Sequence, residues 1–551
     1  MNITIDGVKH DVKQGTSILE MLDNNFLSLK DRPLAAQIGG EIYSLNYVPY
    51  PDTSLKLLTY SSTEGRRVYE RTLQFVFLAS INSLFENATV SIEYTLSSGL
   101  YTKIKNINTL TQKHVDLIKN KMHEIIAAKI PLIRKRLSID EAIDYFSSKK
   151  QFDKVELLKW RRYTYFDVYS LSDAYMDYYY GEMAPDTSYV SVFDLLLLDN
   201  ALLLLVPNEN NPQVPVSYIH EPKLSAVFSE TEHWNSLMNC STVSELNEHI
   251  KNGTINELIR INEALHEKRY ANIADMIVAK KARAVLIAGP SSSGKTTSAN
   301  RISTQLRVLG QKPVMLSMDD YYLNRSEMVP DENGQYDFEH INTLDIPRFS
   351  NDLSLLLKGD EVETPLFDFT TGSRKKEGRK IKLGENEPLI IEGIHALNPI
   401  IFSGNTDINE KDLFKVYVSA LTTLNIDSHN RIRTTDVRLL RRLVRDNATR
   451  STPIEQTLSM WPSVRRGEKR WIFPHQENAD ILLNTTLIYE IAVLKKYIYP
   501  LLRQVEKKSE HYVTARNLLK FLNYISDADV EKEIPPTSIL REFIGGNTFY
   551  R

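Results

Sequence analysis

The sequence predicts an α/β protein whose carboxy-terminal half contains a doubly wound parallel sheet. Short apolar runs alternate with helical segments from about residue 284 to 484, which is the pattern of a parallel sheet covered by helices. The first run leads into a glycine-framed loop, and an amphipathic helix follows that loop. The predicted strands are 284–288, 314–317, 389–392, 416–419 and 481–483.

Composition limits the number of domains and the compartment. A chain of 551 residues is too long for one core, so about three to four domains are expected. The formal net charge of −3 argues against a surface devoted to nucleic acid or membrane, although a local basic patch stays open. The single cysteine, Cys240, excludes a disulfide framework. With no signal peptide at the start, we expect a cytoplasmic protein.

Residues 1–62 predict a small β-grasp domain, which is the fold of ubiquitin. Strands at 3–5 and 55–59 enclose a turn at Asp6-Gly7 and a helix at 17–24. Residues 63–225 predict an α+β domain with helices at 70–84 and 111–128. Its most apolar run, 192–206, is interrupted by Asp199-Asn200, which favours a hairpin over a membrane span.

Three further segments complete the predicted organisation. Residues 226–280 form a helical connector, because 242–281 has a helical pattern. Residues 281–500 form the α/β domain, and 501–551 form a helical tail with a helix at 513–524.

The loop from Gly289 to Thr296 fits the phosphate-binding pattern G-x-x-x-x-G-K-[ST]. Glycines let the backbone N–H groups approach phosphate oxygens, Lys295 neutralises the β and γ oxygens, and the Thr296 hydroxyl holds Mg²⁺. ATP and Mg²⁺ are therefore the expected cofactors. The following helix is predicted to bury Ala299, Ile302, Leu306 and Leu309 and to stop at Gly310. The expected nucleotide-binding residues are Gly289, Pro290, Ser291, Ser292, Ser293, Gly294, Lys295, Thr296 and Thr297.

Acidic residues after two other strands favour a kinase among the proteins that have this loop. Asp319 and Asp320 follow the second strand, and Glu392 ends the third, so all three lie at the edge of the sheet where ligands bind. A carboxylate there can accept the proton of an attacking hydroxyl or hold the metal. The alternative is that Asp319 and Asp320 cap the next segment and that Glu392 is incidental. The sequence contains no guanine-binding or transporter signature, which lowers the GTPase and transporter alternatives.

Arginines recur at helical spacing in the segment 438–450. Such a run is often only a solvated helix face, but arginine suits multidentate phosphate contact. A mobile arginine segment that closes over ATP would stabilise the charge of the transferring phosphoryl group. The arginines at this spacing are Arg438, Arg441, Arg442 and Arg445.

These motifs resemble the uridine kinase and phosphoribulokinase group of P-loop kinases over about residues 281–490. The matching segments begin at Gly289, Asp319, Tyr336, Glu392, Arg441 and Ile472. The resemblance implies that Asp319 is the general base, that Glu392 supports Mg²⁺ with Thr296, and that Arg445 and Arg450 belong to a lid over the phosphates. It also implies that the nucleoside is held by Tyr322, Glu339, Phe367 and Arg442.

The positions that would read the base depart from the family pattern. The family has a tyrosine, a histidine, an arginine and a glutamine where this chain has Phe367, Gly372, Thr452 and Met460. Because hydrogen-bonding groups of a site reject the wrong base when they are left unpaired, these losses make uridine a doubtful substrate. A purine nucleoside or another ribose-like alcohol stays open.

Residues 1–225 resemble the TGS and editing domains of threonyl-tRNA synthetase, through segments beginning at Ala36, Leu57 and Asp177. The editing site of that family uses two histidines, a cysteine and a third histidine. Here the matching positions are Glu70, Gln74, Tyr179 and Met183, which cannot reproduce that chemistry. We expect a regulatory platform for RNA or a nucleotide, with plain structural support as the alternative.

The sequence as a whole predicts an ATP-dependent nucleoside kinase that phosphorylates the 5′-hydroxyl. The alternative is an RNA-binding regulator in which the P-loop domain is a nucleotide-controlled switch. We expect a homo-oligomer with no membrane partner.

Overall fold

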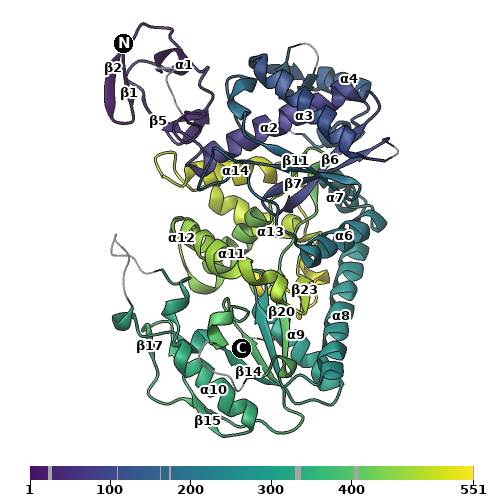
Figure 1. The fold of residues 1–551 in the computed structure, drawn as a ribbon, viewed down its shortest axis with the longest axis vertical. Helices are drawn as coiled ribbons and strands as arrows, with labels where there is room; N and C mark the ends of the chain where they lie inside the picture. Colours follow the sequence, from purple (N-terminus) through teal and green to yellow (C-terminus); the bar gives the residue numbers. More distant parts are fainter. Residues whose placement is uncertain are drawn as a thin grey trace.

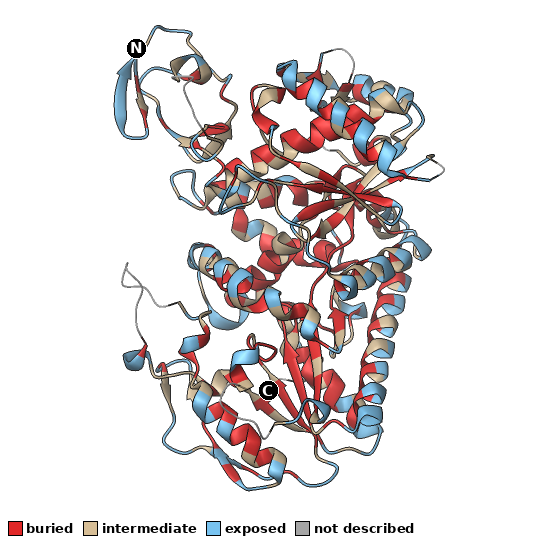
Figure 2. Ribbon diagram, in the orientation of Figure 1, coloured by how far each residue is buried: buried red, intermediate tan, exposed pale blue. Residues whose placement is uncertain are grey.

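A computed structural model describes residues 1–22, 28–107, 109–161, 163–172, 175–328, 337–402 and 408–549. The molecule is elongated, with the amino-terminal sheet at one end and the parallel sheet toward the other (Figure 1). Figure 2 shows buried residues gathered along the parallel sheet and along the long helix α2 (Thr63–Leu84). Within the described residues, none of the helices has the length and apolar character needed to cross a bilayer.

The amino-terminal strands form the predicted β-grasp. The five-stranded sheet has the order β2-β1-β5-β3-β4, and its central pair, β1 and β5, is parallel. Asp6 and Gly7 have φ of 48° and 86°, the conformation of a type I′ hairpin turn. The helix α1 (Ile18–Met21) is capped by Ser17, and the predicted end of this helix lies outside the described residues. The strands are Asn2–Ile5, Val8–Asp11, Ala35–Ile38, Glu41–Tyr43 and Ser54–Leu58 for β1 to β5.

The second unit packs two antiparallel sheets with helices. One sheet has the order β11-β12-β7-β6, and the other has the order β10-β9-β8. The predicted hairpin is confirmed, since β11 and β12 pair antiparallel on either side of Asp199-Asn200. The strands are Thr89–Leu96, Gly99–Lys105, Leu132–Ser138, Tyr165–Leu171, Tyr175–Asp177, Asp194–Leu198 and Ala201–Leu205 for β6 to β12, and α3, α4 and α5 are Gln112–Ala127, Ile139–Ser148 and Phe152–Leu158.

Three helices connect this unit to the parallel sheet. They are α6 (Pro222–Leu237), α7 (Val243–Lys251) and α8 (Ile255–Lys280). The helix α6 starts before the predicted connector because Pro222 occupies its first turn, where the missing N–H costs nothing. The long helix α8 runs along one side of the molecule and packs on α9 (Lys295–Val308) (Figure 1).

The predicted parallel sheet is confirmed, with strand order β14-β19-β13-β20-β23. Every neighbouring pair is parallel, and β13, which precedes the P-loop, is central and buried along its whole length. The strands β13, β14 and β19 have the predicted bounds, whereas β20 starts earlier, at Leu413, and β23 ends at Asn484. The five strands are Ala284–Ala288, Val314–Ser317, Leu389–Glu392, Leu413–Ser419 and Ile481–Asn484 for β13, β14, β19, β20 and β23.

Helices and short hairpins surround this sheet. The helix α10 is Ile346–Lys358, α11 is Thr434–Arg450, α12 is Ile454–Gly467 and α13 is Glu490–Leu502. The hairpins pair β15 with β18, β16 with β17, and β21 with β22. Their strands are Val362–Thr364, Phe367–Asp368, Ser373–Arg374, Arg379–Ile381, Asn425–Asp427 and Asn430–Arg431 for β15 to β18, β21 and β22.

The predicted helical tail returns to both ends of the molecule. The helix α14 (Tyr512–Leu522) packs on α13 and on β4 of the amino-terminal sheet. The short helix α15 (Arg541–Ile544) packs on α11, beside the P-loop. One detail of the sequence analysis is wrong, because Leu309 is 40% exposed and follows the last residue of α9 instead of joining its buried face.

Candidate active site

The P-loop has the backbone that the motif predicts. A Cβ on Gly289 would lie 2.0 Å from the Val418 carbonyl oxygen, so only glycine fits between β13 and β20. Gly294 has φ of +85°, and Ser292 also has a positive φ of 59°, which turns the chain into the start of α9. The loop therefore presents backbone N–H groups and the positive end of α9 to an anion.

A cavity of about 670 Å³ lies over this loop. It joins the P-loop to Asp319, Glu392 and the arginines of α11, as the sequence predicts. Gly289, Pro290, Ser293 and Thr297 shape the loop without lining the cavity. The predicted residues that line it are Ser291, Ser292, Gly294, Lys295, Thr296, Asp319, Tyr322, Glu339, Glu392, Arg442, Arg445 and Arg450.

Two carboxylates lie at the ends of neighbouring strands. The Ser317 hydroxyl links them, since it donates to Glu392 Oε1 (3.2 Å) and accepts from the Asp319 N–H (3.3 Å). Burial and the nearby Asp319 raise the pKa of Glu392 to about 7, against the opposing effect of Lys295. Burial also raises the pKa of Asp319, and Lys295 opposes this rise.

These residues fit the predicted divalent cation. Thr296, Glu392 and Asp319 provide only oxygen donors, which Mg²⁺ prefers. Burial is the main cause of the raised pKa of Glu392, and repulsion from Asp319 adds to it, so a bound cation would favour the ionised carboxylates. Among the described residues, no group of three or more His, Cys, Asp and Glu side chains is arranged to hold a metal alone, so phosphate oxygens would complete the site.

Three of the predicted arginines gather on one carboxylate, Asp446. Arg445 donates to Asp446 Oδ1 through two nitrogens (3.1 and 2.9 Å), and Arg442 donates to Oδ2 (3.3 Å). Arg450 lies 3.5 Å from Oδ1, and Arg442 also donates to the Ser291 hydroxyl of the P-loop (3.1 Å). Asp446 therefore positions all three arginines, a role that the sequence analysis missed.

The other two arginines of the run do not belong to a mobile segment, which corrects that part of the prediction. Arg438 and Arg441 are fully buried and pair with Glu468 and Glu490. Arg438 Nε donates to the Ser291 carbonyl (2.9 Å), and Arg441 Nη1 donates to the Ser292 carbonyl (3.4 Å). These arginines brace the backbone of the P-loop from behind.

An aromatic and acidic wall that includes Tyr322, Glu339 and Phe369 forms the side of the cavity where the resemblance places the acceptor, and we call it the acceptor wall. Tyr322, Phe367 and Phe369 contact one another with ring centroids 5.1 to 6.1 Å apart. Phe369 lines the cavity, whereas Phe367, the predicted contact, does not. Burial and Glu468 raise the pKa of Glu339 to about 7, and its Oε2 has no hydrogen-bond partner among the described residues. Tyr336, which begins the matching motif, lies outside the described residues.

Three positions at which this chain differs from the family's base-reading residues lie away from the cavity wall. Gly372 has φ of +67°, and a Cβ there would lie 2.4 Å from Arg325 Nε, so the arginine takes the space of a side chain at 372. Met460 is 36% exposed. Neither these residues nor Thr452 line the cavity.

The carboxy-terminal segment contributes a residue to the wall of the P-loop cavity that no sequence motif predicts. Glu542 of α15 lines the cavity, and its Oε2 accepts a hydrogen bond from the Thr297 hydroxyl (2.6 Å). A Cβ on Gly294 would lie 3.0 Å from the Ile539 side chain. This segment therefore covers the start of α9 on the side that faces the P-loop cavity.

The editing-like positions meet a hairpin of the kinase half. Glu70 pairs with Arg431 (3.0 Å) and Arg433 (3.1 Å), and Gln74 donates to the His429 carbonyl. Tyr179 lines a cavity shared with these residues, and Met183 is fully buried. The hairpin β21–β22 and the residues after it therefore occupy the place that the resemblance gives to the editing site.

Comparison with known proteins separates the two halves. Two threonine–tRNA ligases match amino-terminal regions. That of Desulforamulus reducens is 29% identical over 28% of this chain and 24% of its own length, and that of Clostridium kluyveri is 25% identical over 47% and 39%. The chain thus spans at most about two fifths of these ligases.

The carboxy-terminal half matches kinases. A solved structure, "Structure of a Possible Uridine Kinase from Bacillus stearothermophilus", aligns over 39% of this chain and 98% of its own at 21% identity, with a TM-score of 0.27. The uridine kinase of Staphylococcus epidermidis is 30% identical over 36% of this chain and 84% of its own length. The pattern of the Phosphoribulokinase / Uridine kinase family matches residues 284–491. With its P-loop, Asp319 and the arginines of α11 around one cavity, this chain belongs to the Phosphoribulokinase / Uridine kinase family.

Proposed function

We propose that the protein is an ATP-dependent kinase that transfers the γ-phosphate of ATP to the 5′-hydroxyl of a nucleoside. The observation that carries this proposal is the cavity of about 670 Å³, in which a P-loop lysine, an acidic side chain and an acceptor wall face one space. A nucleotide switch needs no acceptor wall, so its presence favours an enzyme.

Lys295 and the loop N–H groups bind the β- and γ-phosphates. Asp319 accepts the proton of the 5′-hydroxyl while the hydroxyl oxygen bonds to the γ-phosphorus and the bond to the β-phosphate oxygen breaks, releasing ADP. The raised pKa of Asp319 makes it a stronger base than an ordinary aspartate. Arg442, Arg445 and Arg450 lie where they would stabilise charge on the transferring group.

Thr296 and Glu392 would hold Mg²⁺, which supplies charge neutralisation at the phosphate oxygens when bound. Ionised Glu392 is the form that can bind a cation. Since the pKa of Glu392 is raised to about 7, the metal and the proton compete for this carboxylate near neutral pH.

The acceptor wall supports a nucleoside with a flat base. Phe369 and Tyr322 line the cavity and offer ring faces on which a base can stack, while Glu339 offers a carboxyl group to sugar hydroxyls. Because the family's base-reading groups are absent from the wall, stacking would dominate over hydrogen bonding and the base preference would be broad.

An ATP-coupled assay over a panel of purine and pyrimidine nucleosides, with inositol and ribulose 5-phosphate as non-nucleoside alcohols, tests this proposal. We expect turnover with at least one nucleoside and loss of that turnover with its 5′-deoxy analogue. Equal inactivity of all nucleosides, with ATP still bound, would contradict the assignment.

The RNA-binding alternative has support in the similarity to threonine–tRNA ligases. One observation weighs against it. The editing-like positions are occupied by the chain's own hairpin. A rise in ATP hydrolysis on adding tRNA without a nucleoside would favour the regulator.

A further inference from the structure

A second cavity, of about 110 Å³, lies where the amino-terminal half meets the kinase half. It is open to solvent, since the side chains of Arg67, Glu70, Arg433 and Asp436 each keep about a fifth of their surface exposed. Four parts of the chain form it: the helix α2, Tyr179 and Tyr180 after β10, the segment that leads from β21 into α11, and the helix α14. The lining residues used below are Arg67, Glu70, Arg71, Arg431, Arg433 and Asp436.

Four arginines and two carboxylates give this cavity an excess of positive charge. Arg431 and Arg433 share Glu70. Arg67 pairs with Asp436 (3.5 Å) and with Glu64 (2.8 Å), which approaches from outside the lining. Each of these three arginines therefore pairs with a carboxylate. The net positive charge of the cavity depends on the fourth arginine, Arg71.

Arg71 has no carboxylate within 4 Å among the described residues. Its Nε donates to the Glu182 carbonyl (3.0 Å), and no other hydrogen bond of its guanidinium group is found there. A Cβ on Gly181 would lie 2.8 Å from Arg71 Cζ, so the guanidinium group packs closely against this glycine. Burial, with Arg433 and Arg67 nearby, lowers the pKa of Arg71 to about 10. Glu64 opposes this fall in pKa, so Arg71 remains a cation at neutral pH, and no carboxylate among the described residues pairs with it directly.

A fixed guanidinium group beside other arginines suits a phosphate group. Its planar fork binds two oxygens at once, and such charge-assisted bonds are stronger than neutral ones. Lys520 of α14 lies close to this positive charge, since burial, Arg71 and Arg516 together lower the pKa of its ammonium group. The volume admits a few water molecules or one small anion.

We infer that this cavity binds the phosphate group of a small anionic ligand, held by Arg71 together with Arg67 and Arg433. The phosphate group of the ligand would supply the anionic partner that Arg71 lacks. Because the ligand would contact both α2 and the residues after β22, it would bridge these two parts of the chain. Since α11 starts at Thr434, the ligand would bind at the root of the helix that carries Arg442, Arg445 and Arg450. Arg433 and Arg442 are nine residues apart, about 14 Å along a helix, so the two cavities are separate sites on one rigid element.

The experiment uses the full chain with Lys295→Ala, which removes the phosphate-binding lysine of the P-loop. Isothermal titration calorimetry with inorganic phosphate at constant ionic strength should give a saturable one-to-one isotherm. Adding Arg71→Gln should weaken this binding at least about tenfold, because a charge-assisted bidentate contact is lost. Arg71→Lys, which keeps the charge but loses the fork, should weaken it less and guards against misfolding of the first variant.

Arg136→Gln is the matched control, because Arg136 is an exposed arginine of the same unit that pairs with Asp167 (2.8 Å). It should leave phosphate affinity unchanged. Adenosine 5′-monophosphate and acetate, titrated in parallel, separate a phosphate ester and a plain carboxylate from the free ion. tRNA is titrated in the same way. The inference would be overturned if Lys295→Ala bound neither phosphate nor the ester, or if phosphate bound equally well to the Arg71→Gln and Arg71→Lys variants. It would also be overturned if tRNA bound and phosphate did not.

Discussion

The two cavities of this protein differ in what satisfies their charged side chains. In the P-loop cavity, charged groups face about 670 Å³ of open space, and Glu339 Oε2 and the Ser292 hydroxyl have no hydrogen-bond partner among the described residues. In the cavity at the junction, about 110 Å³ remains, and Glu70, Arg431 and Arg433 satisfy one another. The chain itself completes most charged groups of the junction cavity, which stabilises the interface, and among the described residues only Arg71 is left for a ligand to complete. The P-loop cavity leaves several polar groups for a ligand to complete, as a working site requires.

The buried ion pairs next to the hairpin β21–β22 are a second set of charged groups that the chain itself completes. Asp177 is fully buried and contacts Lys154 (2.8 Å) and His429, and Lys154 also contacts Asp427 (3.2 Å). Lys154 and His429 hold the pKa of Asp177 well below its usual range, although burial opposes them. This network joins the two halves of the chain, since Lys154 and Asp177 belong to the amino-terminal half and Asp427 and His429 to the kinase half.

The largest effect is expected from Lys295→Ala. Loss of the lysine should lower turnover by at least about a thousandfold, because the charge of the transferring phosphate loses its main partner. Tyr179→Phe, at an editing-like position, should leave turnover unchanged within roughly twofold, as a residue remote from the chemistry. Initial rates of ADP release measure both. A comparable loss in Tyr179→Phe would show that the junction takes part in catalysis.

Asp177→Asn should lower the free energy of unfolding and should leave turnover largely unchanged. Removing one partner of a buried ion pair leaves Lys154 and His429 undercompensated, at a cost of about 3–5 kcal/mol. Urea unfolding measures the free energy of unfolding. The control Glu124→Gln breaks an exposed pair with Lys121 and should cost less than about 1 kcal/mol. Equal stability of the two variants would refute the idea that the hairpin is locked by this network.

The pH dependence of activity and stability should run in opposite directions. Activity needs ionised Glu392, so kcat/KM should rise with pH and level off above about 7, with roughly tenfold loss per unit below that. The folded-state pKa is raised above its ordinary value of 4.5, so the protonated carboxyl is favoured in the folded protein. Its contribution to stability is full below about 4.5 and is lost as pH rises through about 7.

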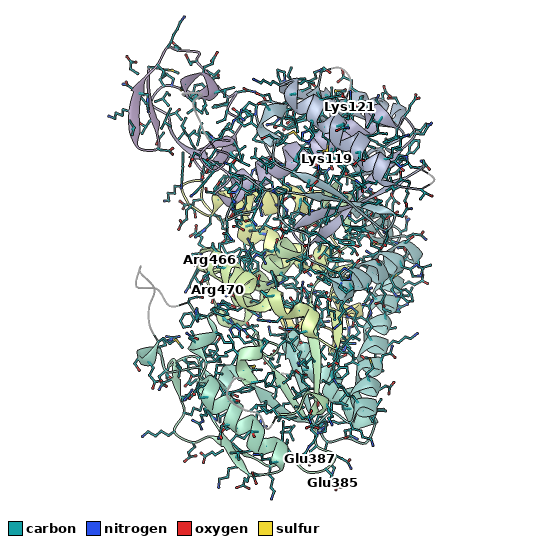
Figure 3. All side chains as sticks on the ribbon, viewed as in Figure 1. Lys119, Lys121, Glu385, Glu387, Arg466 and Arg470 are labelled. Carbon is teal, nitrogen blue, oxygen red and sulfur yellow. The ribbon has the colours of Figure 1, made fainter. Side chains whose placement is uncertain are left out.

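Thermal unfolding of the ligand-free protein between pH 5 and 8 checks the second half of this prediction. Glu392→Gln should flatten the decline in midpoint, and Glu385→Gln, a change at an exposed residue labelled at the lower end of the molecule in Figure 3, should not. Glu339, with a pKa of about 7, contributes a decline of the same sign that remains in both variants. A midpoint that rises with pH in the wild type and not in Glu392→Gln would contradict the account.

The smallest effect is expected at the positions where this chain differs from the family's base-reading residues. Met460→Gln restores the family's residue at an exposed position off the cavity wall, so nucleoside preference should shift by less than roughly threefold. Ratios of kcat/KM for uridine and adenosine measure it. A shift of tenfold or more toward uridine would indicate that α12 closes onto the base.

Local pattern was sufficient to predict the sheet and the P-loop. The strand Ala284–Ala288 is a continuous apolar run, and Gly289 and Gly294 have backbone roles that the motif states. Strand ends also placed Asp319 and Glu392 at one edge of the sheet. These features depend on residues close in sequence and on the rule that parallel strands share an edge, which is why they could be predicted.

Contacts between distant segments could not be predicted. Glu542 is 245 residues from Thr297, and neither residue carries a sign of the other in the sequence. The burial of Arg438 and Arg441 depended on Glu468 and Glu490, whose positions follow only from the packing of α11. The occupation of the editing-like positions required the hairpin at 425–431, which has no recognisable motif.

The most direct test of the central claim compares ATP binding with phosphoryl transfer in Asp319→Asn. Because Asp319 is proposed to accept the proton of the attacking hydroxyl, the variant should bind ATP with the affinity of the wild type and lose about a hundredfold or more in kcat with the best nucleoside. Equilibrium titration with a non-hydrolysable ATP analogue and a single-turnover assay give the two quantities. Wild-type turnover in Asp319→Asn would contradict the account.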